Sequence, residues 1–213
     1  GFPMKLILLH VLGQTTESWR EVVAGIGLSE VTVYSLFDTL VPNERVTLER
    51  LNQKLKGYLK GNSEPYLLGG LSLGGVMTLR HGMDGDPLLR GIIVAAGQFE
   101  APNKALMALQ NSVFRILPPS LLKKSGMDLS KQQLLELMAD MAKLDLRGSL
   151  RRIEVPTLLL CGAKDRVNLP ATKELAELLP QAKIRILPKG KHELNVTSPA
   201  LVAAEVNAFI KNL

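Results

Sequence analysis

The pentapeptide Gly70-Leu71-Ser72-Leu73-Gly74 has the spacing Gly-x-Ser-x-Gly and lies between an apolar run and a stretch with helical spacing. A serine on a tight turn from a strand into a helix must adopt strained backbone angles. Small residues two positions before and after it remove the Cβ atoms that would collide there. Such a turn exposes the hydroxyl at the carboxyl end of a strand and points the next backbone N–H at the same place. The pattern therefore predicts that Ser72 is a nucleophile.

A serine hydroxyl needs a base, usually a histidine that is oriented by a carboxylate. The chain has three histidines. His81 lies about two turns along the expected helix after Ser72 and cannot reach back to the top of the strand. His10 ends the first expected strand and is interpreted as structural. His192 follows the last expected strand in a glycine-containing loop, so we predict that His192 is the base.

Asp165 is the predicted acid, because it follows another expected strand and would lie at the same edge of the sheet as His192. The order Ser, Asp, His along the chain is the one expected for such a sheet. Asp38, at the end of the second expected strand, is the alternative acid. Glu193 is adjacent to His192 and would normally point away from it.

Two backbone N–H groups must stabilise the negative charge that develops on the substrate oxygen, and losing one costs ~3 kcal/mol. The N–H of Leu73 directly follows the nucleophile. The N–H of Leu12, in the loop after the first expected strand, is the predicted second donor.

Strand and helix patterns alternate along the chain, which predicts parallel strands with helices on both faces. Strands are expected at 5–9, 31–36, 65–68, 90–96, 157–161 and 184–187, and helices at 19–23, 48–59, 74–83, 171–179 and 199–210, the last capped by Ser198. We expect one α/β domain over residues 1–213, a three-layer αβα sandwich with a mostly parallel sheet of about six strands.

Residues from about 98 to 152 carry no strand pattern and contain helical patches, such as 105–109 and 134–144. An all-helical insert usually lies over the carboxyl ends of the strands, where ligands bind. The segment is therefore a candidate lid, and ordinary crossover helices packed on the sheet are the alternative.

The composition indicates a globular protein and disfavours several other classes of protein. The chain has 213 residues, of which 46% are hydrophobic, and a mean hydropathy of +0.13. No apolar run reaches the ~20 residues that cross a bilayer, and the apolar start at 5–12 is interpreted as a strand rather than a secretory signal. Cys161 is the single cysteine, so no intramolecular disulfide forms; it is expected in the core of a cytoplasmic protein. No metal site or cofactor is expected.

The net charge is +6, and Lys and Arg are spread along the chain with only 4% aromatic residues. This pattern disfavours nucleic-acid binding. Lys189 and Lys191 flank the loop of His192. They are interpreted as solvated surface or, alternatively, as a bias toward anionic substrates.

The residues match a known family in several places. The matching pieces are Leu8-Leu9-His10 with Gly13 and Trp19, the segment Gly69 to Gly75, Val155-Pro156-Thr157 leading to Gly162-Ala163-Lys164-Asp165, and His192-Glu193-Leu194-Asn195. The chain resembles the alpha/beta-hydrolase-fold enzymes, in particular the small single-domain esterase-like branch. The resemblance implies Ser72, His192 and Asp165 as the catalytic triad, with Leu73 and Leu12 as oxyanion donors.

Two residues depart from the family pattern. Val11 follows His10 where the family usually has glycine, and Lys191 precedes His192 where it usually has glycine. A β-branched residue resists the backbone angles that glycine allows, so the oxyanion hole is expected to differ in shape.

These residues predict a serine hydrolase that cleaves a small carboxylic ester, thioester or lactone through an acyl-enzyme intermediate. The expected partner is a small-molecule substrate, and the protein is expected to be a monomer or homodimer. The alternatives are hydrolysis of a carbon–carbon bond, cofactor-free perhydrolysis, or a weakly catalytic ligand-binding or sensor protein.

Overall fold

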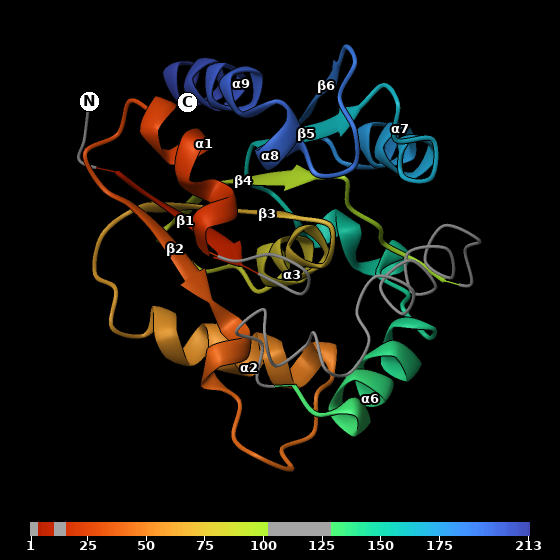
Figure 1. The fold of residues 1–213 in the computed structure, drawn as a ribbon. Helices are drawn as coiled ribbons and strands as arrows, with labels where there is room; N and C mark the ends of the chain where they lie inside the picture. The colour runs from red at the N-terminus through yellow and green to blue at the C-terminus, as the bar shows by residue number, and fades with distance from the viewer. Residues whose placement is uncertain (1–3, 11–15, 102–128) are drawn as a thin grey trace.

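The structure is a computed structural model that describes residues 4–10, 16–101 and 129–213. These residues form one six-stranded sheet in which every neighbouring pair is parallel, with the order β2-β1-β3-β4-β5-β6. The strands are β1 Lys5–His10, β2 Val31–Ser35, β3 Tyr66–Leu71, β4 Leu89–Ala95, β5 Thr157–Gly162 and β6 Ala182–Leu187. Figure 1 shows the sheet between layers of helices, which confirms the predicted α/β sandwich.

Helices cover both faces of the sheet (Figure 1). The α-helices are α1 Arg20–Gly25, α2 Leu48–Leu59, α3 Leu73–Gly82, α6 Lys131–Met141, α7 Leu169–Leu178, α8 Leu194–Thr197 and α9 Pro199–Lys211, and the 3-10 helices are η1 Thr16–Trp19, η2 Leu36–Thr39 and η3 Arg147–Arg152. Side chains of α1, α8 and α9 share one apolar core with the sheet. Those of α2, α3, α6 and α7 share the other.

The strand order places a change of direction between β1 and β3. From β1 the chain first adds β2 on one side and then adds β3, β4, β5 and β6 in turn on the other. In open α/β sheets ligands bind outside the carboxyl ends of the strands, at the point where the order reverses. Ser72 directly follows β3, so it lies at this point.

Most element boundaries agree with the sequence prediction within two residues. The main difference is β3, which continues three residues past the expected end at Leu68 to Leu71. Gly69 and Gly70 concealed this extension, because glycine usually weakens a strand. Here the site is closely packed, since a Cβ on Gly69 would lie 3.2 Å from side-chain atoms of both Leu8 and Ile93. Ser198 is at the N-cap of α9, as predicted, but its side chain makes no capping hydrogen bond.

The second part of the predicted insert packs against α2. Ser130 and Gln133 form a capping box at the start of α6. Glu136 and Asp140 then accept hydrogen bonds from the backbone N–H groups of Val46 (3.2 Å) and Leu48 (2.7 Å). The helical patch expected at 105–109 lies outside the described residues, so a lid formed by the whole segment stays a prediction.

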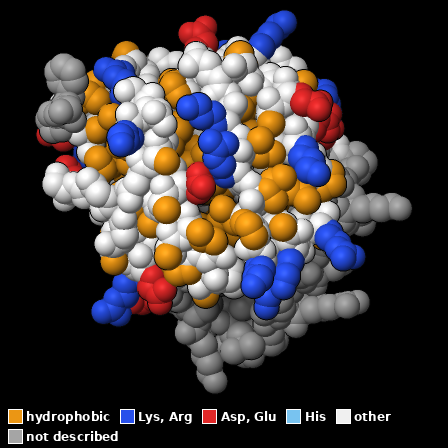
Figure 2. All heavy atoms as spheres, turned by 90° about the horizontal axis from the view of Figure 1, so that it is seen from above, with side chains coloured by type: hydrophobic (Ala, Val, Ile, Leu, Met, Phe, Trp, Pro, Cys, Tyr) orange, Lys and Arg blue, Asp and Glu red, His pale blue; other side chains and the backbone are white. Residues whose placement is uncertain are grey.

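Basic side chains are scattered over one face of the molecule. On the face shown in Figure 2, Lys and Arg side chains are separated by apolar and uncharged surface. Within the described ranges, no helix has both the length and the apolar character needed to cross a bilayer.

Candidate active site

Ser72 occupies the strained turn that the pentapeptide predicts. Its backbone angles are φ 57° and ψ −115°, a region that non-glycine residues rarely adopt. The Ser72 N–H donates to the carbonyl of Ala95 at 2.8 Å, and the Ser72 carbonyl accepts from Val76 N–H at 3.0 Å. The turn is thus held by β4 on one side and by the first turn of α3 on the other. A conformation of this kind costs ~1–3 kcal/mol and persists where the surrounding structure enforces it.

Glycines on both sides make the turn possible. A Cβ on Gly70 would lie 2.4 Å from the carbonyl carbon and oxygen of Gly74, closer than any side chain tolerates. A Cβ on Gly75 would lie 3.2 Å from Val94 Cγ1, where α3 crosses β4. The glycine requirement inferred from the pentapeptide therefore corresponds to a physical close approach at Gly70.

His192 and Asp165 are joined by a hydrogen bond. His192 Nδ1 lies 2.8 Å from Asp165 Oδ2, and the two residues come from the loops after β6 and β5. The Asp165 side chain is 4% exposed, whereas that of His192 is 30% exposed. The imidazole is therefore anchored at one nitrogen and reachable from solvent. Asp38, the alternative acid, is exposed in η2.

Backbone hydrogen bonds join these two loops to each other. Lys164 N–H donates to the Gly190 carbonyl at 3.0 Å, and Ala163 N–H donates to the Leu187 carbonyl at 2.9 Å. Gly162 and Gly190 approach so closely that a Cβ on Gly162 would lie 2.2 Å from Gly190 O. Glycine at 162 is thus required for the separation observed between Asp165 and His192.

Two buried amides that the sequence analysis missed complete the surroundings of Asp165. Asn168 Nδ2 lies 3.1 Å from Asp165 Oδ1, 3.0 Å from Asp165 Oδ2 and 3.0 Å from His192 Nδ1. Gln98 Nε2 donates to Asn168 Oδ1 at 2.7 Å. The Asp-x-x-Asn spacing was the available signal for Asn168. Nothing local points to Gln98, which is 70 residues away in the sequence.

The electrostatics of this cluster favour an ionised Asp165. Burial is the largest single effect and raises its pKa, but the hydrogen bonds from His192 and Asn168, together with the charge interaction with His192, outweigh burial. The pKa of Asp165 is therefore lowered from its ordinary value.

The structure does not bring every predicted site residue together. Among the residues that the structure describes, no hydrogen bond joins Ser72 Oγ to His192. Such bonds are often long in ligand-free enzymes. Leu73 is the first residue of α3, where a backbone N–H has no acceptor within the helix. Leu12 lies outside the described residues, so its role as an oxyanion donor stays a prediction.

The remaining histidines and the cysteine have structural surroundings. His10 Nδ1 contacts Ser35 Oγ at 3.1 Å at the ends of β1 and β2. His81 is buried at the far end of α3, with Nε2 2.7 Å from the Tyr66 hydroxyl. Cys161 is fully buried in β5, and burial raises its pKa to about 11. In the described part of the chain, no group of three His, Cys, Asp or Glu side chains could hold a metal ion.

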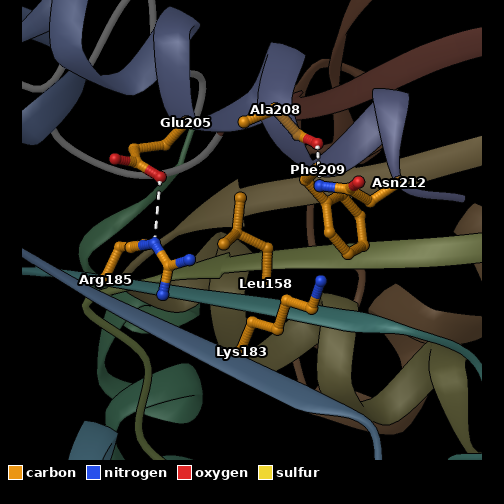
Figure 3. A pocket seen from close by; sticks show the side chains of 7 residues that line it. All are labelled: Leu158, Lys183, Arg185, Glu205, Ala208, Phe209 and Asn212. Atoms are coloured by element: carbon orange, nitrogen blue, oxygen red, sulfur yellow. Dashed lines mark hydrogen bonds and ion pairs between the residues drawn. The ribbon is translucent and has the colours of Figure 1, made fainter.

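A small pocket lies elsewhere, between β5, β6 and the end of α9. Figure 3 shows Arg185 reaching up from β6 toward Glu205 on α9, at an N–O distance of 3.4 Å. The lining residues are Leu158, Lys183, Arg185, Glu205, Ala208, Phe209 and Asn212. None of them is a nucleophile with a neighbouring base, and Leu158 and Lys183 are near the amino ends of their strands. The pocket is therefore separate from the candidate site.

Two named bacterial enzymes are similar to this chain in sequence. A 2-succinyl-6-hydroxy-2,4-cyclohexadiene-1-carboxylate synthase from Serratia proteamaculans is 25% identical over 253 residues, covering 97% of this chain and 93% of that protein. A putative enzyme of the same name from Bacillus subtilis is 33% identical over 68 residues, which are 32% of this chain and 25% of that protein.

Similarity to a solved structure extends over nearly the whole chain. The enol-lactonase from Burkholderia xenovorans superposes with a TM-score of 0.78 at 17% identity, covering 99% of this chain and 92% of that one. The sequence profile described as "Alpha/beta hydrolase family" matches residues 6–205. With the parallel sheet and the turn at Ser72, this match shows that the chain belongs to the alpha/beta hydrolase family.

Proposed function

We propose that this protein is a serine hydrolase that cleaves a small carboxylic ester, thioester or lactone through an acyl-enzyme intermediate. One observation carries the proposal: the 2.8 Å hydrogen bond between His192 and Asp165 lies at the edge of the sheet where the strained turn presents Ser72. A nucleophile, a base and an orienting acid at one sheet edge are the groups that acyl transfer needs.

In the proposed reaction, Ser72 Oγ attacks the substrate carbonyl carbon while His192 Nε2 takes the hydroxyl proton. Asp165 accepts the His192 Nδ1–H hydrogen bond and stabilises the imidazolium that forms. The N–H groups of Leu73 and Leu12 hold the oxyanion. His192 then gives its proton to the departing alcohol or thiol. Water, deprotonated by His192, attacks the acyl-enzyme and releases the acid.

The loops around the candidate site carry positive charge, which bears on the charge of the substrate. Lys164, Arg166, Lys189 and Lys191 are all exposed on the two loops that carry Asp165 and His192. A cationic rim raises the local concentration of anions. A panel of p-nitrophenyl esters with neutral and carboxylate-bearing acyl groups, assayed at two ionic strengths, measures this bias.

Labelling with a fluorophosphonate tests the nucleophile directly. We expect one phosphonyl group per chain in intact-mass spectra, mapped to the peptide that holds Ser72, and none in Ser72→Ala. Hydrolysis of short-chain p-nitrophenyl esters is expected to fall by at least ~10³-fold in Ser72→Ala and His192→Ala. Turnover that persists in Ser72→Ala would show that Ser72 is not the nucleophile.

A second candidate function follows from the relative that matches along nearly its whole length. That relative is named as a synthase that forms a cyclohexadiene carboxylate, 2-succinyl-6-hydroxy-2,4-cyclohexadiene-1-carboxylate. Formation of that product by this protein, detected by chromatography, without a trapped acyl-enzyme on Ser72 would favour this function over ester hydrolysis.

A further inference from the structure

Asn168 is the side chain in closest contact with both predicted partners of Ser72, and no catalytic step uses it. Its Nδ2 atom lies at 3.0–3.1 Å from both carboxylate oxygens of Asp165 and at 3.0 Å from His192 Nδ1. Asn168 is 2% exposed and Gln98 is also 2% exposed, so solvent does not compete for these hydrogen bonds.

The identity of the atom that faces Asp165 follows from its neighbours. An amide nitrogen and oxygen are distinguished by the groups they meet. Gln98 Nε2 donates to Asn168 Oδ1 at 2.7 Å on the outer side, and the Asp165 carboxylate requires donors on the inner side. The carboxylate, which can only accept, decides the orientation, and Gln98 then donates to the amide oxygen on the opposite side. The Asn168 amide therefore presents its N–H groups, rather than its oxygen, to Asp165.

The same contacts decide where the imidazole proton lies. If His192 Nδ1 lacked a proton, its lone pair would face the carboxylate at 2.8 Å, which repels an ionised Asp165. With the proton on Nδ1, both His192 and Asn168 donate to Asp165 Oδ2, at 2.8 and 3.0 Å. The 3.0 Å approach of the two nitrogens is then the consequence of two donors sharing one oxygen. This tautomer leaves Nε2 free to accept a proton from Ser72, as the proposed reaction requires.

We infer that Asn168, oriented by Gln98, is a positioning residue that holds the Asp165 carboxylate in place and thereby keeps the Nδ1 proton of His192 directed at Oδ2. The inference rests on the proposed function, because it assigns a role within the same triad. Asn168 acts through Asp165 and does not touch the reacting atoms.

A structural role is the competing explanation, because Asn168 also begins α7. Its backbone N–H donates to Asp165 Oδ1 at 3.3 Å and its carbonyl accepts from the Thr172 hydroxyl at 2.9 Å. Those backbone contacts survive a side-chain replacement. Leucine at 168 removes only the amide hydrogen bonds at similar volume, so the two roles can be separated.

Asn207 offers a matched control. Its side chain also makes two hydrogen bonds, accepting from Gly27 N–H and donating to the Gly25 carbonyl, each at 2.8 Å. These bonds join α9 to the end of α1, on the face of the sheet whose core α1, α8 and α9 share. Asn207→Leu therefore removes a similar set of bonds without touching Asp165 or His192.

The experiment compares Asn168→Leu, Gln98→Leu and Asn207→Leu with the wild type. For Asn168→Leu we expect kcat on p-nitrophenyl acetate to fall about 10- to 100-fold while KM changes less than threefold, because orientation rather than binding is lost. Gln98→Leu should lower kcat about 3- to 10-fold, and Asn207→Leu should change neither parameter.

Proton NMR of the free protein gives a readout that does not depend on turnover. We expect a far-downfield resonance from the His192 Nδ1 proton, assigned by its loss in His192→Gln, retained in Asn207→Leu, and broadened or absent in Asn168→Leu. If Asn168→Leu does not fold, Gln98→Leu carries the comparison. Unchanged kcat and an unchanged resonance in the folded variant would overturn the inference, as would absence of the resonance from the wild type. Failure of the proposed function appears separately, as a wild type that no fluorophosphonate labels.

Discussion

Replacement of Gly162 by alanine is expected to separate Asp165 from His192. The new Cβ would lie 2.2 Å from Gly190 O and 2.7 Å from Lys191 O, both atoms of the backbone that leads into His192. An ordinary contact of 3.4 Å, less the 2.2 Å available, requires a displacement of about 1.2 Å. Because the obstacle is backbone rather than a flexible side chain, the loop itself must move.

That displacement is large compared with the tolerance of the site. The His192–Asp165 hydrogen bond is 2.8 Å long, and it is lost beyond ~3.5 Å. A shift of the reacting groups by ~1 Å costs about 100-fold in rate, and loss of the orienting bond costs up to ~10⁴-fold. We therefore expect kcat to fall by 10²- to 10⁴-fold. Overpacking should also lower the free energy of unfolding by ~1–3 kcal/mol.

The assay is p-nitrophenyl acetate hydrolysis, with thermal melting as the measure of folding. Gly190→Ala is expected to be intermediate, because its nearest contact is 2.9 Å, to Gly162 Cα. Gly148→Ala is the matched control, since nothing lies within 4 Å of its Cβ. A folded Gly162→Ala variant with kcat within threefold of the wild type would refute the reasoning that this glycine sets the distance between acid and base.

Three further predictions concern stability. Gly57→Ala, in the exposed interior of α2 with nothing within 4 Å of the new Cβ, should raise the free energy of unfolding by ~0.5–1 kcal/mol in urea titrations. Ser72→Gly should be about 1 kcal/mol more stable than Ser72→Ala, because only glycine relaxes at φ 57°; equal stabilities would mean the turn stores no strain. Burial lowers the pKa of His81 below its ordinary 6.5, against the opposing effect of Asp84 and Asp86. The stability that neutral His81 contributes is therefore fully present above pH 6.5, and the free energy of unfolding should fall as the pH drops below that value. Urea titrations from pH 5 to 8 should show a flatter dependence in His81→Gln.

The sequence was sufficient for the features that depend on local periodicity and on order along the chain. Apolar runs and helical spacing located all six strands of the described sheet and most helices. The rule that parallel strands end at one edge then placed Asp165 and His192 together. The exclusion of His81 agrees with the structure, because His81 lies at the opposite end of α3, where it contacts Tyr66.

Contacts between distant segments could not be read in the same way. Gln98 reaches Asn168 because the end of β4 lies beside the end of β5, and no local pattern marks Gln98 as part of the site. The extension of β3 through Gly69 and Gly70 was concealed for a related reason. Glycine is needed at these two positions because atoms of β1, β4 and α3 lie too close for a side chain, and not because the strand prefers glycine.

Backbone strain in the described chain gathers where the chemistry is proposed. Four non-glycine residues have positive φ, and three of them, Ser72, Ala96 and Lys189, directly follow or lie just beyond the carboxyl ends of β3, β4 and β6. Each such residue costs ~1–3 kcal/mol unless its surroundings enforce it. At Ser72 and Ala96 hydrogen bonds to the neighbouring strand do so, through Ala95 O and Leu160 O at 2.8 Å. The rigid parallel sheet thus supports conformations at its carboxyl edge that an isolated loop would not keep, and for this reason a 1.2 Å intrusion at Gly162 is expected to reach His192 instead of dissipating in the loop.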